Sequence, residues 1–174
     1  LNMGLRYSAF GQYNGIEPRA TFRYTLDETS SLKWGVTRNL QYIHLVTNAG
    51  TTLPTDLWVP STPRVKPQLS WQYAAGYFKN FNNGMFETSF ELYYKTMQNQ
   101  IEYREGYTPS LKDPEEEFVF GKGWSYGAEM FINKVKGRLT GWIGYTLGWT
   151  WRKFPDLNQG LKYPSRFDRR HDLS

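Results

Sequence analysis

Hydrophobic and polar residues alternate along seven stretches of the sequence, each about nine to fifteen residues long. Residues 18–26 illustrate the pattern, in which Ala20, Phe22, Tyr24 and Leu26 alternate with Arg19, Thr21, Arg23 and Thr25. Successive side chains of a strand point to opposite faces of a sheet, so each stretch predicts a strand with one apolar face. The connections alternate between short and long. The sequence therefore predicts an all-β chain, an antiparallel up-and-down meander of about seven strands.

The alternation also gives approximate bounds for each strand. It predicts strands over residues 1–10, 18–26, 31–44, 67–79, 85–103, 119–133 and 139–151, and a further strand that starts near 168. Asn14-Gly15 and Asn82-Asn83-Gly84 are typical of turns. The three long connections are an exposed loop over residues 45–66, which holds three prolines, a polar segment after residue 103, and residues 154–166.

The composition indicates that the apolar face meets a membrane. Aromatic residues make up 18% of the chain, with 7 Trp, 13 Tyr and 11 Phe, and they suit the girdles where a barrel contacts lipid headgroups. The mean hydropathy of -0.66 does not exclude a membrane, because tilted barrel strands cross it with about nine to eleven residues and only one face is apolar. Arg38 falls on an apolar face, which indicates either a side chain that reaches the headgroups or a bulge that shifts the register.

Charged residues gather on the opposite face of the predicted strands. They are Arg6, Arg19, Arg23, Glu87, Glu91, Lys95 and Glu129. In a dry core, each unpaired charge would cost several kcal/mol, whereas in a hydrated lumen the cost is small. The sequence therefore favours a transmembrane barrel with these residues facing the lumen. The alternative is a soluble carbohydrate-binding β-sandwich, whose inner faces are dry.

Little in the sequence points to catalysis or to a cofactor. The chain has no cysteine, which excludes disulfides and thiolate metal sites, and its net charge of +5 is scattered without a nucleic-acid recognition motif. The two histidines, His44 and His171, lie in no zinc-protease motif and beside no serine nucleophile motif. Glu87 and Glu91 would lie about 13 Å apart, too far for a glycosidase pair. We therefore predict no enzyme activity, no cofactor, no metal and no nucleic-acid partner, and interpret residues 115–117, three glutamates, as a solvated loop rather than a Ca²⁺ site.

Three residues are candidates for contact with a ligand at the rim of the barrel. Trp58 lies at a loop tip, where its ring could stack on a sugar or a porphyrin; the alternative is that it braces its own loop or lies at the lipid interface. His44, at the outer end of a strand, could ligate haem or a metal chelate, or else hydrogen-bond to its neighbours. Arg64, with Lys66, could steer anionic ligands or bind lipopolysaccharide phosphates.

Several short motifs follow one another along the chain. They are Glu17-Pro18-Arg19, RNLQYIHL at 38–45, LPTDLWVP at 53–60, Lys66-Pro67-Gln68 with Gly76-Tyr77-Phe78, YYKTMQNQI at 93–101 and DRRHDL at 168–173. In their order and spacing, these motifs resemble the barrel region of TonB-dependent outer-membrane receptors of the Bacteroidota type. The likeness extends over essentially the whole chain.

The resemblance implies a transmembrane β-barrel of about 22 strands in the outer membrane of a Gram-negative bacterium. Residues 1–174 would form a single partial segment of that barrel, without the plug domain and the remaining strands. The parent receptor would bind a scarce nutrient (an iron chelate, haem, cobalamin, a glycan or a peptide) and import it when the TonB complex acts on the plug.

The expected partners are the TonB complex, outer-membrane lipid and lipopolysaccharide, an unknown small-molecule ligand and a surface lipoprotein. A passive porin or a surface adhesin would share the wall pattern and would lack a plug. A strand pattern runs up to both ends of the sequence, so we expect a piece of a longer chain that is ordered only in a larger barrel, in detergent or against other copies of itself.

Overall fold

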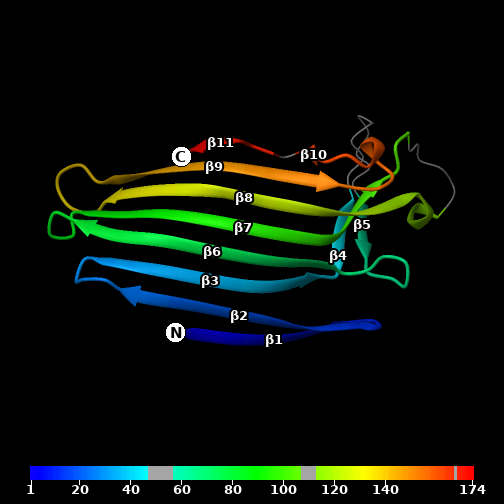
Figure 1. Ribbon diagram of the computed structural model, residues 1–174, viewed down its shortest axis with the longest axis horizontal. Coiled ribbons are helices and arrows are strands. Elements are labelled where there is room, and N and C mark those ends of the chain that lie inside the picture. Colours follow the sequence, from blue (N-terminus) through cyan, green and yellow to red (C-terminus); the bar gives the residue numbers. More distant parts are fainter. Residues whose placement is uncertain (47–56, 107–112, 167) are drawn as a thin grey trace.

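One antiparallel sheet of nine strands dominates the structure, and its long strands run side by side across the molecule (Figure 1). The computed structural model describes residues 1–46, 57–106, 113–166 and 168–174. The strands of the sheet are β1 (Asn2–Phe10), β2 (Tyr13–Thr25), β3 (Ser30–Gln41), β6 (Gln68–Phe81), β7 (Phe86–Tyr103), β8 (Phe118–Lys134), β9 (Gly141–Lys153), β10 (Tyr163–Pro164) and β11 (His171–Leu173). A separate two-stranded sheet and two short 3-10 helices complete the described structure: β4 (Ile43–Val46), β5 (Leu57–Pro60), η1 (Pro114–Glu117) and η2 (Asn158–Gly160).

The strands follow one another across the sheet in chain order, β1-β2-β3-β6-β7-β8-β9-β10, and β11 also pairs with β9. Every pairing is antiparallel. The prediction of an all-β up-and-down meander is therefore confirmed, with β1 to β3 and β6 to β9 as its long strands. Across the described residues the sheet stays open, because β1 pairs only with β2. No helix in the described part of the chain is long and apolar enough to cross a membrane.

Apart from the short link between β1 and β2, the connections at the end of the sheet that carries β4 and β5 are longer than those at the opposite end (Figure 1). One end carries the short links after β2, β6 and β8, whereas β4, β5, η1 and η2 lie at the other end (Figure 1). Asn82, Asn83 and Gly84 form the link after β6 with φ angles of 51°, 53° and 72°, a conformation that Asn and Gly tolerate best. This confirms the turn predicted there.

The first hairpin turns earlier than the sequence predicted. The predicted turn at Asn14-Gly15 is wrong, because the two-residue link between β1 and β2 begins with Gly11, whose φ is 57°. Gly15 lies inside β2 and allows close packing instead, since an added Cβ would lie 2.2 Å from Cδ1 of Leu40. β2 also continues through Pro18, its predicted start, because its pairing with β3 begins only after that residue.

The strand predicted over residues 31–44 is divided in two. β3 ends at Gln41, and β4 leaves the large sheet to pair with β5. The prediction that residues 45–66 form only an exposed loop is wrong for β5, because the side chain of Val59 on this strand is buried in a small core. That core joins the β4–β5 hairpin to the ends of β7 and β8, and consists of Val46, Val59, Val65, Ile101, Tyr103 and Phe118. Residues 47–56 of the predicted loop and 107–112 of the predicted polar segment lie outside the described residues.

β7 contains a bulge that decides which face its last residues occupy. Its register with β8 shifts between Met97 and Gln100. Asn99, inside the bulge, has a φ of 54° and donates a hydrogen bond from Nδ2 to the carbonyl of Pro67, 2.8 Å away. The extra residue turns Gln100 toward Gln68, to whose Oε1 it donates from Nε2 at 3.0 Å. The predicted strand over residues 85–103 is confirmed, but simple alternation would place Gln100 on the opposite face.

The connection after β9 is more ordered than a loop. Residues 154–166, predicted as a long connection, contain η2 and the short strand β10, so this connection has secondary structure of its own. Phe154 and Leu157 are buried with Val119 of β8, and Tyr163 packs against this cluster. Burial of these apolar side chains folds the connection back onto the sheet. β11 confirms the strand predicted to start near residue 168.

Candidate functional site

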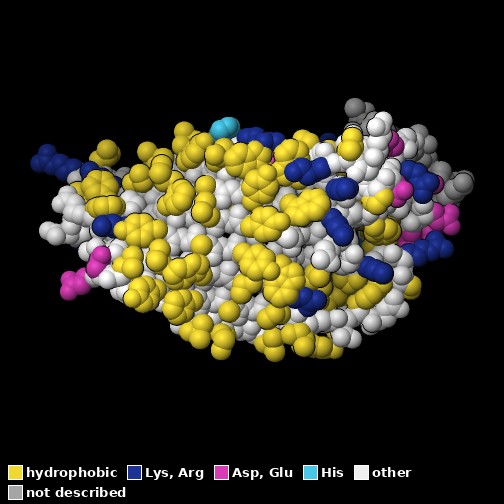
Figure 2. Space-filling view, viewed as in Figure 1, with side chains coloured by type: hydrophobic (Ala, Val, Ile, Leu, Met, Phe, Trp, Pro, Cys, Tyr) yellow, Lys and Arg dark blue, Asp and Glu magenta, His cyan; other side chains and the backbone are white. Residues whose placement is uncertain are grey.

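One face of the large sheet is apolar and exposed. The register places Val36, Tyr73, Tyr94, Tyr126 and Trp149 opposite one another across β3, β6, β7, β8 and β9. Figure 2 shows hydrophobic side chains over most of this face, and Tyr73 and Tyr94 are 48% and 43% exposed. A continuous apolar surface of this kind marks contact with a membrane or with another protein.

Arg38 lies within this apolar face. β3 pairs with β6 residue by residue from Ser30 to Gln41, which excludes the bulge considered for Arg38. The side chain lies opposite Trp71, and its Nη1 donates a hydrogen bond to the carbonyl of Ile16. The long arginine side chain thus reaches a polar partner on the neighbouring strand while it stays on the apolar side.

The other face of the sheet is polar. The register places on it all seven residues that the sequence assigned to one charged face, namely Arg6, Arg19, Arg23, Glu87, Glu91, Lys95 and Glu129. None of them shares a face with Phe22 or Tyr145, which belong to the apolar side. That this charged face lines a lumen stays a prediction.

Charges of one sign lie side by side in one row of the polar face. Arg23 lies opposite Lys33, Glu91 lies opposite Glu129, and Gly76 separates the two pairs. No ion pair among the described residues joins the cationic pair to the acidic pair. Like charges directly opposite each other destabilise a strand pair by roughly 0.2–1 kcal/mol. The row therefore presents separate cationic and anionic surfaces to an occupant of this face.

A hollow of about 430 Å³ lies along the same row, and Arg23, Lys33, Phe78 and Glu91 are among its lining residues. Nζ of Lys33 lies 3.7 Å from the centroid of the Phe78 ring, which holds the cation over an aromatic face. Gly76 keeps the floor of the hollow low, because a Cβ there would lie 2.8 Å from Cγ of Glu91.

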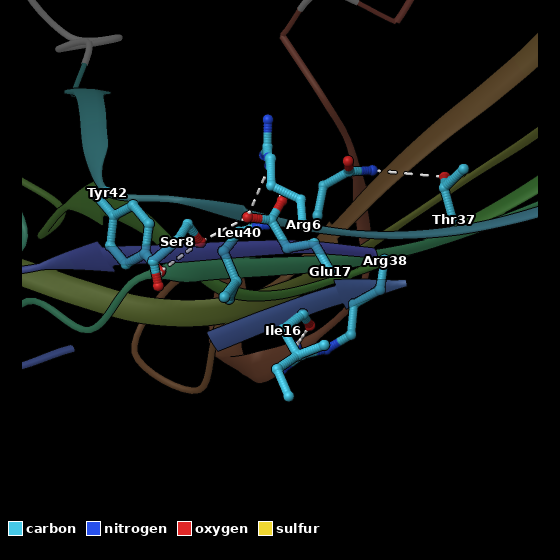
Figure 3. A network of polar contacts seen from close by, with 9 residues as sticks. Arg6, Ser8, Ile16, Glu17, Thr37, Arg38, Leu40 and Tyr42 are labelled. Carbon is cyan, nitrogen blue, oxygen red and sulfur yellow. Dashed lines mark hydrogen bonds and ion pairs between the residues drawn. The ribbon is translucent and has the colours of Figure 1, made fainter. Parts of the chain in front are cut away.

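Glu17 is the centre of a hydrogen-bond network that ties β1, β2 and β3 together (Figure 3). Its side chain is only 2% exposed. The carboxylate accepts from Nε of Arg6 at 3.1 Å, from Oγ of Ser8 at 2.6 Å and from the N–H of Leu40 at 3.2 Å. The Ser8 hydroxyl also lies 2.9 Å from the hydroxyl of Tyr42. Glu17 thus gives Arg6 its partner, a pairing that alternation alone did not predict.

A second network on the polar face surrounds Arg152. This residue lies opposite Gly123, and its Nη1 donates to Oε1 of Gln100. Nearby, the hydroxyl of Tyr163 donates to Oε2 of Glu102 at 2.9 Å. The sequence analysis missed this network, because the bulge in β7 and the strand β10 bring its members together and neither feature has a clear sequence pattern.

The three rim candidates do not form one site. His44 is fully buried, and its Nε2 lies 3.1 Å from the hydroxyl of Ser61. Trp58 lies one position along the β4–β5 hairpin, on its other face, and is 65% exposed. Nη1 of Arg64 lies 3.6 Å from the carboxylate of Glu116. A ligand role for these residues stays a prediction.

His44 carries the one buried side-chain nitrogen or oxygen that lacks a hydrogen-bond partner within the described part of the structure, its Nδ1. Burial lowers the pKa of this imidazole, which favours its neutral form. Within the same residues, no group of three or more His, Asp or Glu side chains is placed to hold a metal ion.

Long antiparallel strands with one exposed apolar face and one charged face, linked by short turns at one end, define the wall of a transmembrane β-barrel. The family described as "TonB dependent receptor-like, beta-barrel" matches residues 1–170, and the chain belongs to this family. The family consists of outer-membrane receptors and transporters of Gram-negative bacteria rather than enzymes. Comparison with curated proteins and with solved structures gave no match. The resemblance to the TonB-dependent receptor barrel is confirmed, and the Bacteroidota type stays a prediction.

Proposed function

We propose that this chain forms part of the wall of a receptor that binds a scarce nutrient outside the cell and imports it with energy delivered through TonB. The observation that carries the proposal is the two-sided sheet, apolar and exposed on one face and charged on the other. Such a sheet is stable where one face meets lipid and the other meets water or a polar occupant. The complete barrel has about 22 strands and surrounds a plug domain, with the charged face toward the plug.

The lengths of the connections orient the barrel in the membrane. Outer-membrane barrels have short periplasmic turns and longer extracellular loops. The links after β2, β6 and β8 therefore face the periplasm, and the end that carries β4, β5, η1 and η2 faces the cell exterior (Figure 1). Trp58 and Arg64 lie at this exterior end, where an incoming ligand or a surface lipoprotein arrives first.

The nutrient that the proposed receptor imports is an iron chelate, haem, cobalamin, a glycan or a peptide. The row of Arg23, Lys33, Glu91 and Glu129 supports a polar or charged occupant of the lumen rather than an apolar one, because an apolar occupant would leave these charges desolvated without partners. The nearest polar occupant is the plug domain itself, which TonB moves during import.

An uptake assay on the full-length protein tests this proposal. A strain that lacks only this receptor is compared with its parent for uptake of radiolabelled ferric chelates, haem, cobalamin and a defined oligosaccharide and peptide mixture. Loss of uptake of one probe in the deletion strain, its return with the gene, and its loss when TonB is removed support energised import.

Two results would contradict the proposal. Uptake that persists without TonB indicates a passive porin. A full-length protein that purifies from the soluble fraction and stays monodisperse without detergent indicates a soluble β-domain with a covered apolar face.

A further inference from the structure

Three lysines lie next to one another on the apolar face. Lys122 on β8 lies directly opposite Lys153 on β9. Lys162 directly precedes Tyr163 of β10, which pairs with Arg152, the residue before Lys153. All three residues are exposed. The position of Lys162 on this face follows from its Nζ, which lies 4.2 Å from the ring centroid of Trp151.

The lysine row lies directly beside a pair of tryptophans. Trp124 and Trp151 are opposite each other, two residues along each strand from Lys122 and Lys153 and therefore on the same face. The row is displaced from the tryptophans toward the end that carries β4 and β5. Figure 2 shows Lys and Arg side chains in a line across the otherwise hydrophobic face near that end.

No carboxylate among the described residues forms an ion pair with any of these lysines. The ion pairs that the structure describes involve other cations: Arg6, Arg64, Arg169 and Arg170. Because directly opposed like charges destabilise a strand pair, an anion at this place would relieve the repulsion. The site therefore favours a ligand with at least one negative charge.

We infer that Lys122, Lys153 and Lys162 bind the phosphate groups of an outer-leaflet lipid, lipopolysaccharide. This inference rests on the proposed outer-membrane function and adds a lipid site to it. The acyl chains of such a lipid lie along the apolar face and the tryptophans mark the level of the headgroups, where the lysines meet the phosphates. A soluble anion would make no favourable contact with the apolar surface that surrounds the three lysines.

This site differs from the one that the sequence suggested for lipid phosphates. Arg64 already has the carboxylate of Glu116 3.6 Å from its guanidinium, and it lies in the connection after β5. The three lysines have no such carboxylate and lie on the lipid-facing side of the wall. Their signal in the sequence is hidden, because Lys122 and Lys153 interrupt apolar positions and lie on strands that are far apart in the sequence.

Lipid binding by the full-length protein in detergent tests the inference. Native mass spectrometry measures the affinity for diphosphorylated lipid A, and the test variant is Lys122→Gln/Lys153→Gln. Each lysine near a phosphate-bearing surface contributes about a fivefold gain in affinity, so the double variant should bind lipid A roughly 25-fold more weakly. Dephosphorylated lipid A should bind the parent protein as weakly as lipid A binds the variant.

Lys79→Gln/Lys134→Gln is the matched control. Lys79 and Lys134 belong to the same apolar face but lie at its periplasmic end, so the control removes the same charge. Its affinity for lipid A should stay within about twofold of the parent value, and neither double variant should lower the parent's thermal midpoint in detergent.

Three outcomes would overturn the inference: equal lipid A affinity for the two double variants, equal affinity of the parent for the dephosphorylated lipid, or displacement of lipid A by millimolar inorganic phosphate. Each can occur while the protein remains a detergent-dependent barrel with TonB-linked uptake. Failure of the lipid site is therefore distinguishable from failure of the proposed function.

Discussion

The side chain of Glu91 on β7 lies directly opposite that of Glu129 on β8, on the polar face of the sheet. The hydroxyl of Ser89 donates to the Glu91 carboxylate at 3.3 Å, and no cation among the described residues forms an ion pair with either glutamate. Two carboxylates placed this way repel each other and destabilise the pairing of β7 with β8. A positively charged group above this face would relieve that repulsion.

Neutralising one carboxylate of this pair should strengthen the local strand pairing. In Glu91→Gln, the repulsion disappears, and the free energy of local opening of β7 and β8 should rise by about 0.2–1 kcal/mol. Hydrogen exchange of the full-length protein in detergent, read by mass spectrometry, measures this change. The control Glu87→Gln loses a carboxylate that accepts from Nδ2 of Asn133 at 3.2 Å, and it should not gain protection. Faster exchange in Glu91→Gln would mean that the pair is not repulsive.

Gly127 should not tolerate a larger side chain. A Cβ at this position would lie 2.4 Å from the carbonyl oxygen of Leu147, a backbone atom that cannot move without disturbing β9. Gly127→Ala should therefore destabilise the β8–β9 pairing by about 1–3 kcal/mol, measured by hydrogen exchange. Gly35→Ala is the control, because its nearest neighbour would be a methyl group of Thr21 at 3.6 Å. Equal protection in the two variants would contradict this packing.

Glu17 should hold β3 against the first hairpin through its negative charge. Glu17→Gln keeps the shape of the side chain but removes the charge that Arg6 and Ser8 contact, and hydrogen bonds to charged groups contribute about 1.5–3 kcal/mol each. The N–H of Leu40, which donates to Glu17, should exchange faster with solvent by at least about tenfold. Glu28→Gln, in the exposed link after β2, should leave that rate unchanged. An unchanged rate in Glu17→Gln would show that the network does not depend on charge.

The β4–β5 hairpin should loosen in acid because of His44. Burial lowers the pKa of His44 in the folded hairpin, whereas the opened hairpin has the ordinary value of about 6.5. Below that pH the opened form takes up a proton that the folded form does not bind. The stabilisation is therefore complete above about pH 6.5 and falls as the pH decreases, by at most about 1.4 kcal/mol per pH unit.

Limited proteolysis of the hairpin between pH 7.5 and pH 5 measures this loss. His44→Gln should remove the pH dependence. His171→Gln should keep it, because His171 is exposed and lies in β11. A hairpin that resists protease equally at both pH values would contradict a neutral, buried His44.

The long strands of the wall were predictable because apolar and polar residues alternate along them with a period of two. Residues such as Tyr73 and Glu91 could be assigned to opposite faces without knowledge of their partners, since alternation alone decides the face. The turn at Asn82-Asn83-Gly84 was equally accessible, because the link needs positive φ angles that few other residues adopt.

The errors have a common physical cause, which is that local pattern does not reveal long-range contacts. Asn14-Gly15 has the sequence of a turn, yet Gly15 allows the close approach of Leu40 from the neighbouring strand β3. The bulge at Asn99 and the buried Val59 depend on neighbours that only the folded chain supplies. The pairing of Lys122 with Lys153 was hidden for the same reason, because it requires the register of β8 and β9.

The sidedness of the sheet is the central claim, and spin-label accessibility in a lipid bilayer tests it most directly. Single cysteines replace pairs of neighbouring residues on β6, β7 and β9 in the full-length protein, and this chain has no cysteine of its own that would also be labelled. The replaced residues are Gln72, Tyr73, Glu91, Leu92, Tyr145 and Thr146. Labels at positions 73, 92 and 145 should contact oxygen dissolved in the lipid, and labels at positions 72, 91 and 146 should contact a water-soluble nickel complex or a polar occupant. Alternation along each strand is the predicted result, and labels with no alternation between lipid and water would contradict the account.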